Sequence, residues 1–289
     1  MESKIILGSA NFDQTYGIKK NFIKKNEIKK LLSLASKYKV KIIDTSPLYS
    51  KSEKIIGSLN NNRFKIISKI PTPPKNTKKK NIYKWIRHQT KNSLKNLKIK
   101  KFECLLLHNS NCLLSKNGKE IYKSVKYMKL DGLTNSIGTS IYDFNILTKI
   151  LKKFQFDLIQ APFNVLDQRL IKTGLLKKLK KKGIKVHVRS IFLQGVLLLK
   201  NSQIPRRLKK YNKTWIIWQN WLKRNKFNSL QACLSFVLRH KELDGFIVGS
   251  NNEKQLTQIL KIRKIKNNFV LPSFKIQDRK LIDPRKWIG

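Results

Sequence analysis

The chain has 289 residues, of which 40% are hydrophobic, and its 64 lysines and arginines against 16 acidic residues give a net charge of +48. This length and apolar content are ample for a sizeable hydrophobic core, in one domain or in two. The chain does not open with a charge-flanked apolar segment, and its apolar runs are far shorter than ~18 residues. We therefore expect a cytoplasmic protein without a signal peptide or a transmembrane helix.

Short apolar, β-branched segments alternate along the chain with longer lysine-rich segments whose apolar residues have helical spacing. The expected strands are Ile5–Ala10, Lys41–Thr45, Phe64–Ile70, Phe102–His108, Thr134–Ser140, Leu158–Ala161, Lys185–Ile191 and Gly245–Gly249. The expected helices are Asn26–Tyr38, Ile82–Leu97, Lys119–Met128, Phe144–Phe154, Ile171–Lys182, Leu230–Arg239 and Glu253–Ile262. This alternation predicts one (β/α)₈ TIM barrel over residues 1–289, with a doubly wound parallel sheet as the alternative fold.

Two segments interrupt the alternation of strands and helices. The first is a proline- and lysine-rich loop, Pro71–Asn81, directly after the third expected strand. The second is a long connection after the seventh strand, Leu197–Lys226, in which Trp215, Trp218 and Trp221 lie on one helical face. These tryptophans either pack the helix onto the barrel rim or form a flap that contacts substrate. We expect the C-terminal tail to lie back on the barrel.

Four polar residues lie at or just beyond the carboxyl ends of the second, third and fourth strands. They are Asp44, Tyr49, Lys69 and His108. In a parallel barrel these strand ends meet at one mouth, so the four side chains should lie close together. A tyrosine hydroxyl becomes a usable general acid near neutral pH when an adjacent ammonium group lowers its pKa. A carboxylate can hold that ammonium group, and a histidine can orient a carbonyl oxygen by a hydrogen bond.

The motifs around these four residues resemble those of the aldo-keto reductases. DTSPLYSKSEKIIG (44–57) contains the acid and the tyrosine, IISKI (66–70) the lysine and LLLHN (105–109) the histidine. Five more stretches resemble the family's strand motifs: LGSANFDQTYGI (7–18), IGTS (137–140), IQAPFNVLDQR (159–169), RSIFLQGVLL (189–198) and IVGSNNEKQL (247–256). The resemblance covers almost the whole chain, with the motifs in the family's order. It implies that Asp44, Tyr49, Lys69 and His108 form a catalytic tetrad.

The resemblance also implies where a cofactor binds. No G-x-G-x-x-G follows the first strand, so a Rossmann-type dinucleotide site is not supported. In the aldo-keto reductases the nicotinamide dinucleotide lies across the barrel mouth, and its carboxamide would meet Ser140 and Gln160 here. Its phosphates would meet the backbone of Ser190–Leu193 and Gly249–Ser250, the latter just before a helix whose amino end favours anions. The implied cofactor is NADPH, with NADH as the alternative.

Three positions depart from the family's pattern. Arg189 stands where many relatives stack an aromatic ring on the nicotinamide. Gln255 stands where some relatives carry a basic residue that grips the 2′-phosphate of NADPH, and Ile259 where many carry an asparagine that faces the adenosine. An arginine at position 189 is similar to a subgroup associated with surface-sugar synthesis. The resemblance therefore implies a sugar-derived carbonyl substrate.

The positive charge suggests a nucleic-acid surface as an alternative. The chain has 53 lysines but only 11 arginines, and the lysines are scattered through nearly every expected helix and loop. A surface selected for nucleic acid would favour the arginine fork and would cluster its cations. Lysine, asparagine and isoleucine are all abundant and share A/T-rich codons. We therefore attribute the charge to genome composition and expect neither a specific nucleic-acid partner nor a membrane partner.

Cysteines and histidines outside the tetrad indicate neither a disulfide nor a metal site. The cysteines, Cys104, Cys112 and Cys233, lack paired spacing, which is typical of reduced cytosolic thiols. The other histidines, without ligand-like partners at metal spacing, are His88, His187 and His240.

The interpretation that joins these patterns is an enzyme that reduces an aldehyde or ketone with NAD(P)H. Tyr49 would protonate the carbonyl oxygen, Lys69 would tune Tyr49, Asp44 would hold Lys69, and His108 would orient the carbonyl. Two alternatives from other classes stay open. One is a non-catalytic barrel that binds the cofactor as a sensor or partner subunit, and the other is a polyanion-binding protein.

Overall fold

The structure of the protein is a computed structural model that describes residues 4–12, 17, 23–262, 269–274, 276 and 278–287. Residues 13–16 and 18 of the first family-like stretch lie outside the described residues, as do the two chain ends and parts of the C-terminal tail. None of the helices described is long and apolar enough to cross a membrane.

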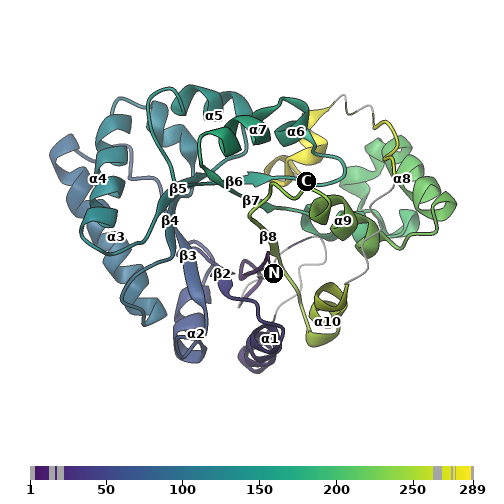
Figure 1. Ribbon diagram of the computed structural model, residues 1–289, viewed down its shortest axis with the longest axis horizontal. Coiled ribbons are helices and arrows are strands. Elements are labelled where there is room, and N and C mark those ends of the chain that lie inside the picture. The colour runs from purple at the N-terminus through teal and green to yellow at the C-terminus, as the bar shows by residue number, and fades with distance from the viewer. Residues whose placement is uncertain are drawn as a thin grey trace.

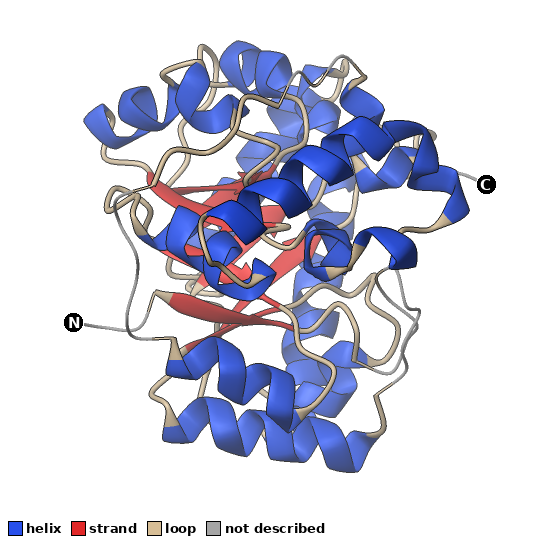
Figure 2. Cartoon of the chain, turned by 90° about the vertical axis from the view of Figure 1, so that its right-hand side faces the viewer, coloured by secondary structure: helices blue, strands red, loops and turns tan. Residues whose placement is uncertain are grey.

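Eight parallel strands close into a barrel in sequence order, so the expected (β/α)₈ architecture is confirmed and the doubly wound alternative is wrong. The strands are β1 (Ile5–Gly8), β2 (Ile42–Asp44), β3 (Lys65–Ile70), β4 (Cys104–Leu107), β5 (Ile137–Ser140), β6 (Leu158–Pro162), β7 (Lys185–Arg189) and β8 (Gly245–Val248). The last strand pairs with the first, with Ile6 opposite Ile247. Figure 2 shows the strands at the centre of the molecule with helices around them.

The helices that follow the strands cover the outside of the barrel (Figure 1). They are α1 (Lys25–Lys37), α2 (Ser52–Leu59), α3 (Ile82–Leu97), α4 (Gly118–Leu130), α5 (Phe144–Ile150), α6 (Arg169–Lys172), α7 (Leu175–Lys181), α8 (Asn212–Arg224), α9 (Ser229–Leu238) and α10 (Glu253–Lys261). Helix α2 was not among the expected helices. The residues that it buries are Ser52, Glu53, Ile56 and Gly57, of which only Ile56 is a large apolar residue, so its sequence shows no clear apolar period.

The two-residue period of the strands separates the outer core from the barrel interior. Ile67 of β3 and Leu158 of β6 belong to a small apolar cluster inside the barrel, together with Leu106. A Cβ at position 138 would lie 2.1 Å from the carbonyl oxygen of Leu158 and 2.7 Å from a Leu106 methyl, so this position in β5 requires glycine. Two residues beyond Ile67 and Leu158, the same interior face carries polar side chains, and these open the functional site.

The tryptophan helix is packed into the molecule and is not a flap. Trp215, Trp218 and Trp221 are all buried, and their indole N–H groups donate to the backbone carbonyls of Leu208, Leu197 and Val270. The rings of Trp218 and Trp221 stack at 5.5 Å. These contacts tie α8 to the long connection after β7 and to the C-terminal segment, which lie to one side of the barrel in Figure 1. The expectation that the tail lies back on the barrel is confirmed, since Leu281 and Ile282 are buried in the main core.

His187 makes the fold sensitive to acid, which gives a first prediction. It is buried on β7, and burial lowers its pKa to about 4. In the unfolded chain this histidine is protonated below its ordinary pKa of 6.5, whereas in the folded protein it stays neutral until about pH 4. The free energy of unfolding therefore decreases as the pH falls from 6.5 to about 4. This histidine should cost about 2 kcal/mol of unfolding free energy between pH 7.5 and pH 5. In urea unfolding, the free energy of unfolding of His187→Asn should decrease between pH 7.5 and pH 5 by about 2 kcal/mol less than that of the parent. An equal decline in parent and variant would contradict the prediction.

Candidate active site

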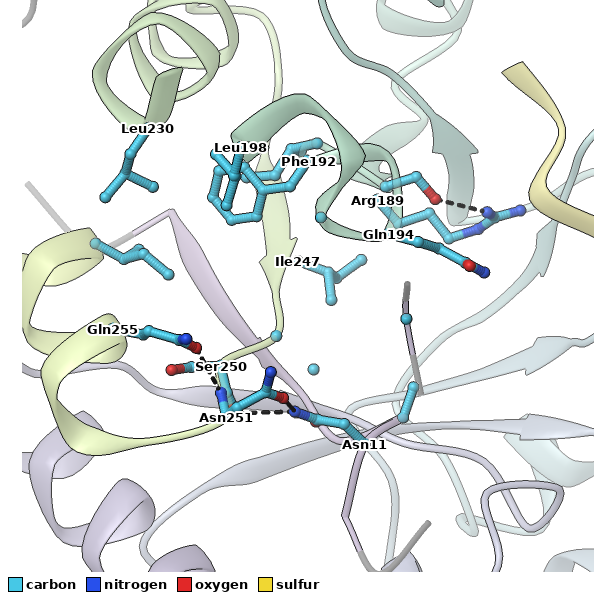
Figure 3. Close-up of a pocket in the computed structure, with 18 of the residues that line it drawn as sticks. Asn11, Arg189, Phe192, Gln194, Leu198, Leu230, Ile247, Ser250, Asn251 and Gln255 are labelled. Carbon is cyan, nitrogen blue, oxygen red and sulfur yellow. Dashed lines mark hydrogen bonds between the residues drawn. The ribbon is translucent and has the colours of Figure 1, made fainter. Parts of the chain in front are cut away.

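A cavity of about 1090 Å³ opens at the carboxyl ends of the strands, where a barrel enzyme keeps its active site. Its lining includes eleven of the twelve residues expected at the site, namely Asp44, Tyr49, Lys69, His108, Ser140, Gln160, Arg189, Ser190, Gly249, Ser250 and Gln255. The exception is Leu193, whose side chain is fully buried in the main core. Figure 3 shows Arg189 and Gln194 at one end of the cavity and Gln255, Ser250 and Asn11 at the other.

A buried ion pair, Asp44 with Lys69, borders this cavity. The Nζ atom of Lys69 donates to Oδ1 of Asp44 at 2.6 Å and to the backbone oxygen of Thr45 at 2.9 Å. Lys69 is 2% exposed and Asp44 4% exposed, so water takes little part in the pair. Burial by itself lowers the pKa of Lys69, but the charge of Asp44, and then the oxygen of Tyr49, outweigh it and the pKa is raised. The lysine is therefore a fixed cation.

Gln160, which the resemblance places at the carboxamide, is also the third member of this buried group, and the sequence did not indicate its bond to Asp44. Its Nε2 donates to Oδ2 of Asp44 at 2.7 Å, so each carboxylate oxygen of Asp44 has its own donor. The other amide atom of Gln160, Oε1, is buried and has no hydrogen-bond partner among the described residues. An unsatisfied buried acceptor is costly, and it calls for a donor from outside the protein.

Tyr49 lies beside the cation and the histidine. The Nζ atom of Lys69 is 5.0 Å from the centre of the Tyr49 ring. The Tyr49 and His108 rings meet edge to face, with centres 6.0 Å apart and planes at 88°. A tight turn positions the tyrosine, because its backbone N–H donates to Ser46 and its carbonyl accepts from Ser52. The tetrad expected from the sequence is therefore assembled in one place.

Buried hydroxyl groups hold this turn against β1. The Ser52 hydroxyl donates to Oγ of Ser9 at 2.8 Å and lies 3.2 Å from Oγ1 of Thr45. The Ser9 hydroxyl in turn bonds the backbone oxygen of Asp44. The first residue after Ser52 is Glu53, whose carboxylate accepts from Ser68 on β3 at 2.8 Å. These residues connect the first turn of α2 to the strands that carry Asp44 and Lys69.

His108 is a neutral group in this site. Burial, and then the positive charge of Lys69, lower its pKa to about 4. Its Nδ1 lies 3.1 Å from the hydroxyl oxygen of Ser46. A neutral imidazole carries one N–H and one lone pair, so it can orient a carbonyl oxygen without competing with Tyr49 as the proton donor.

Arg189 belongs to a stack at the edge of the cavity. Its guanidinium carbon lies 3.8 Å from the centre of the Tyr142 ring, and that of Arg285 lies 3.5 Å from the same centre. Two guanidinium groups cannot share one ring face at these distances, so Tyr142 lies between them. Arg189 also donates to the backbone oxygen of Ile141 at 2.8 Å and to Ser190. Tyr142 lines the cavity and Arg285 packs on its ring. Sequence reasoning missed both residues, because the stack joins β7 to the distant C-terminal segment.

The other end of the cavity is built around the start of α10. The Asn252 side chain caps this helix by accepting from the backbone N–H of Gln255 at 2.9 Å. Oε1 of Gln255 accepts from the backbone N–H of Asn251 at 3.0 Å, so the amide is turned toward its own helix. Asn11, which the sequence did not indicate, donates to the backbone oxygen of Ser250 at 2.8 Å. A Cβ at Gly249 would meet nothing within 4 Å, so the backbone borders open space here.

The residues present fit a nicotinamide dinucleotide. The partnerless Oε1 of Gln160 can accept from a carboxamide NH₂ group, and Ser140 on the neighbouring strand offers a hydroxyl to the same cavity. The open backbone at Gly249 and the capped start of α10 suit a phosphate at the other end. No group of three or more histidine, cysteine or acidic side chains that could hold a metal ion occurs among the described residues.

Comparison with known proteins decides the family. Residues 4–274 match the sequence profile of the Aldo/keto reductase family. The chain belongs to this family. It is therefore an NAD(P)H-dependent oxidoreductase of the carbonyl-reducing kind, as the resemblance implied. No curated protein matches the chain in sequence.

Solved structures of aldo-keto reductases share this fold. AKR11C1 from Bacillus halodurans, in its holo form, has a TM-score of 0.71 at 15% identity, over 99% of this chain and 92% of its own. The glycerol dehydrogenase AKR11B4 from Gluconobacter oxydans has a TM-score of 0.69 at 15% identity, over 98% and 90%. PA4992 from Pseudomonas aeruginosa has a TM-score of 0.65 at 20% identity, over 89% and 88%. At such identities the likeness is one of fold alone.

Proposed function

We propose that this aldo-keto reductase reduces a sugar-derived aldehyde or ketone to an alcohol, with Tyr49 as the proton donor and NADPH as the cofactor. The observation that carries the proposal is the buried Asp44–Lys69 pair beside the Tyr49 ring. A lysine held at 2.6 Å by a carboxylate cannot turn away from its neighbours, so its charge acts on the phenol oxygen. Such a fixed cation favours the phenolate that remains after the proton leaves.

Each residue of the tetrad has its own task in this reaction. When bound, the nicotinamide cofactor would supply the hydride that the carbonyl carbon receives. Tyr49 gives its hydroxyl proton to the carbonyl oxygen, on which negative charge develops. His108 donates a hydrogen bond to the same oxygen, and Asp44 keeps Lys69 in place. Asp44 and Lys69 are buried, so water screens their charges little.

The cofactor would lie along the cavity from Gln160 to the start of α10. Ser140 and Gln160 would bind the carboxamide, and Arg189 would line the nicotinamide end. Ser190 with the turn after it, including the backbone of Leu193, and Gly249 with Ser250 would meet the phosphates. Gln255 borders the end where the adenosine would lie.

The experiment that tests the proposal combines binding with turnover. Calorimetry should show NADPH or NADH binding without added metal, and a screen of aldehydes, ketones and sugar-derived carbonyls should show cofactor oxidation at 340 nm. Absence of binding to either dinucleotide at millimolar concentration would refute the proposal and the sensor alternative together. Binding without turnover across the panel, under conditions where a known reductase is active, would favour the non-catalytic barrel.

The cation at Arg189 should discriminate between the two redox states of the cofactor. No carboxylate pairs with Arg189 among the described residues, whereas Arg285 in the same stack is bound to Asp283 at 2.7 Å. An unpaired cation repels the positively charged ring of NADP⁺ but not the neutral ring of NADPH. Arg189→Tyr should therefore lower the ratio of the NADP⁺ Kd to the NADPH Kd by roughly three- to tenfold. Calorimetry on both forms measures it, and unchanged ratios with unchanged substrate preference would make Arg189 a bystander.

The lysine-rich surface should give only non-specific binding to polyanions. We propose that the protein acts in the cytoplasm on a small molecule and that nucleic acid is not its partner. Any DNA or RNA binding should lack sequence preference and weaken steeply with salt, because it depends on counterion release. Fluorescence anisotropy with two unrelated sequences at several salt concentrations would show this. A sequence-dependent complex that survives physiological salt would support the polyanion-binding alternative.

A further inference from the structure

The neutral His108 can carry its single N–H on either ring nitrogen, and the two forms present opposite groups to the cavity. With the proton on Nε2, the ring offers a hydrogen-bond donor. With the proton on Nδ1, it offers a lone pair, which repels a carbonyl oxygen. The partner of the other nitrogen decides between such forms. Among the described residues Nε2 has no hydrogen-bond partner, and His108 lines the cavity.

The partner of Nδ1 is the hydroxyl of Ser46, two residues beyond Asp44. Oγ of Ser46 lies 3.1 Å from Nδ1. The same oxygen accepts the backbone N–H of Leu48 at 3.2 Å. Ser46 is fully buried, so water does not supply it with further partners. The hydroxyl proton of Ser46 has no other acceptor among the described residues.

A count of donors and acceptors separates the two forms. If Nδ1 carried the proton, it would donate to Ser46, and the Ser46 hydroxyl proton would be buried without an acceptor. An unsatisfied buried donor costs about 1–3 kcal/mol. If Nδ1 carries the lone pair, Ser46 accepts from Leu48 and donates to Nδ1, and every group is satisfied.

We propose that Ser46 is a positioning residue, whose hydroxyl donates to Nδ1 of His108 and holds the imidazole in the form that carries its proton on Nε2. His108 then presents a hydrogen-bond donor to the cavity, at the place where the carbonyl oxygen must lie to meet Tyr49. In this form Nε2 has no lone pair with which to take the Tyr49 proton, so the two side chains have separate roles. The hydrogen bond from Nε2 of His108 to a substrate carbonyl rests on the function proposed above, but the position of the proton on Nε2 does not.

Nitrogen NMR on the ligand-free protein tests the position of the proton directly. With ¹⁵N-labelled histidine, two-bond correlations distinguish the nitrogen that bears hydrogen from the one that bears a lone pair. The chain has four histidines, and His108→Asn identifies the His108 signals by their loss. At pH 7.5 the parent protein should show a lone pair on Nδ1 and a proton on Nε2. A proton on Nδ1 in the parent would overturn the proposal, whatever the variants do.

Variants at Ser46 test the cause. Ser46→Ala should move both nitrogen shifts toward intermediate values, because both forms become populated. Ser46→Thr keeps the hydroxyl and should restore the parent shifts. Ser52→Ala is the matched control. It removes a buried hydroxyl near the same turn, and this hydroxyl bonds Ser9 and not His108. Its His108 shifts should equal those of the parent. Parent-like shifts in Ser46→Ala, or altered shifts in a folded Ser46→Thr, would refute the proposal.

Kinetics extend the test to the reaction. Ser46→Ala should lower kcat by roughly two- to tenfold, a part of the loss that follows removal of a donor to a developing oxyanion. The Kd for NADPH should stay as in the parent, and Ser46→Thr should recover most of kcat. A failure of the proposed reductase activity would leave the NMR result intact. Conversely, Ser46→Ala could lose the Nε2–H form by NMR and still have the parent's kcat. That result would refute the positioning role of Ser46 and leave it a structural role only.

Discussion

Replacing Tyr49 by phenylalanine should lower kcat by at least ~10²–10⁴-fold, the range typical of a lost general acid, while NADPH affinity stays nearly unchanged. The substitution removes the proton that the carbonyl oxygen must receive but keeps the ring, which packs edge to face on His108. Steady-state kinetics and calorimetry on the same preparation would separate the two quantities. Full activity of Tyr49→Phe would show that the proton comes from elsewhere.

Lys69 supplies the decisive control for this prediction. Lys69→Met alone should cost a similar factor in kcat, because it removes the fixed cation whose Nζ lies 5.0 Å from the Tyr49 ring. Added to Tyr49→Phe, it should cost little more, because no phenol remains to be assisted. Groups that act as one unit show this non-additivity. Asp44→Asn should lower kcat less, since it misplaces Lys69 and does not delete it. Multiplicative losses in the Tyr49/Lys69 double variant would contradict the coupling.

Asp44→Asn should strongly lower the free energy of unfolding, apart from its effect on kcat. Lys69 is 2% exposed, and the substitution leaves its charge buried without a counter-ion. Breaking a buried pair from one side costs about 3–5 kcal/mol. Urea unfolding at pH 7.5 would measure the loss. The matched control is Glu27→Gln, which breaks an exposed pair with Lys30 and should cost less than about 1 kcal/mol.

The sign of its pH dependence identifies the cause of this destabilisation. Without Asp44, burial, which is the largest single influence on Lys69, should outweigh the remaining influence of Tyr49 and lower the pKa of Lys69 below its ordinary 10.5. The folded variant then releases a proton that the unfolded chain keeps, so its stability rises with pH up to about 10.5. The gap to the parent should therefore shrink between pH 7.5 and pH 9.5. The double variant Asp44→Asn/Lys69→Met should also be more stable than Asp44→Asn alone. A gap independent of pH would mean that lost packing, not an unpaired charge, destabilises the variant.

Local patterns in the sequence were sufficient to predict the architecture and the four polar residues that meet at the barrel mouth. Each strand appeared as a short apolar segment, because a parallel strand covered on both faces has to be apolar throughout. Asp44, Lys69 and His108 were identifiable because each follows such a segment, and a parallel barrel brings those ends to one mouth. Helix α2 was missed, because three of the four residues that it buries are serine, glutamate and glycine, which give no apolar period.

Only the tertiary structure decided which atoms these residues meet. Gln160 is 116 residues from Asp44 in the sequence. It can bond the carboxylate because the interior faces of β2 and β6 face each other across the closed barrel. The bond between Ser46 and His108 joins residues 62 positions apart, and the Arg189–Tyr142–Arg285 stack includes the C-terminal segment. The side chain of Leu193 is turned into the core, which leaves only its backbone for the phosphate contact that the strand-end motif predicts. The period of a segment is a property of neighbouring residues, so the sequence alone determined the barrel and the four positions proposed to be catalytic. A hydrogen bond across the barrel depends on the curvature of all eight strands at once, which no local stretch of sequence contains.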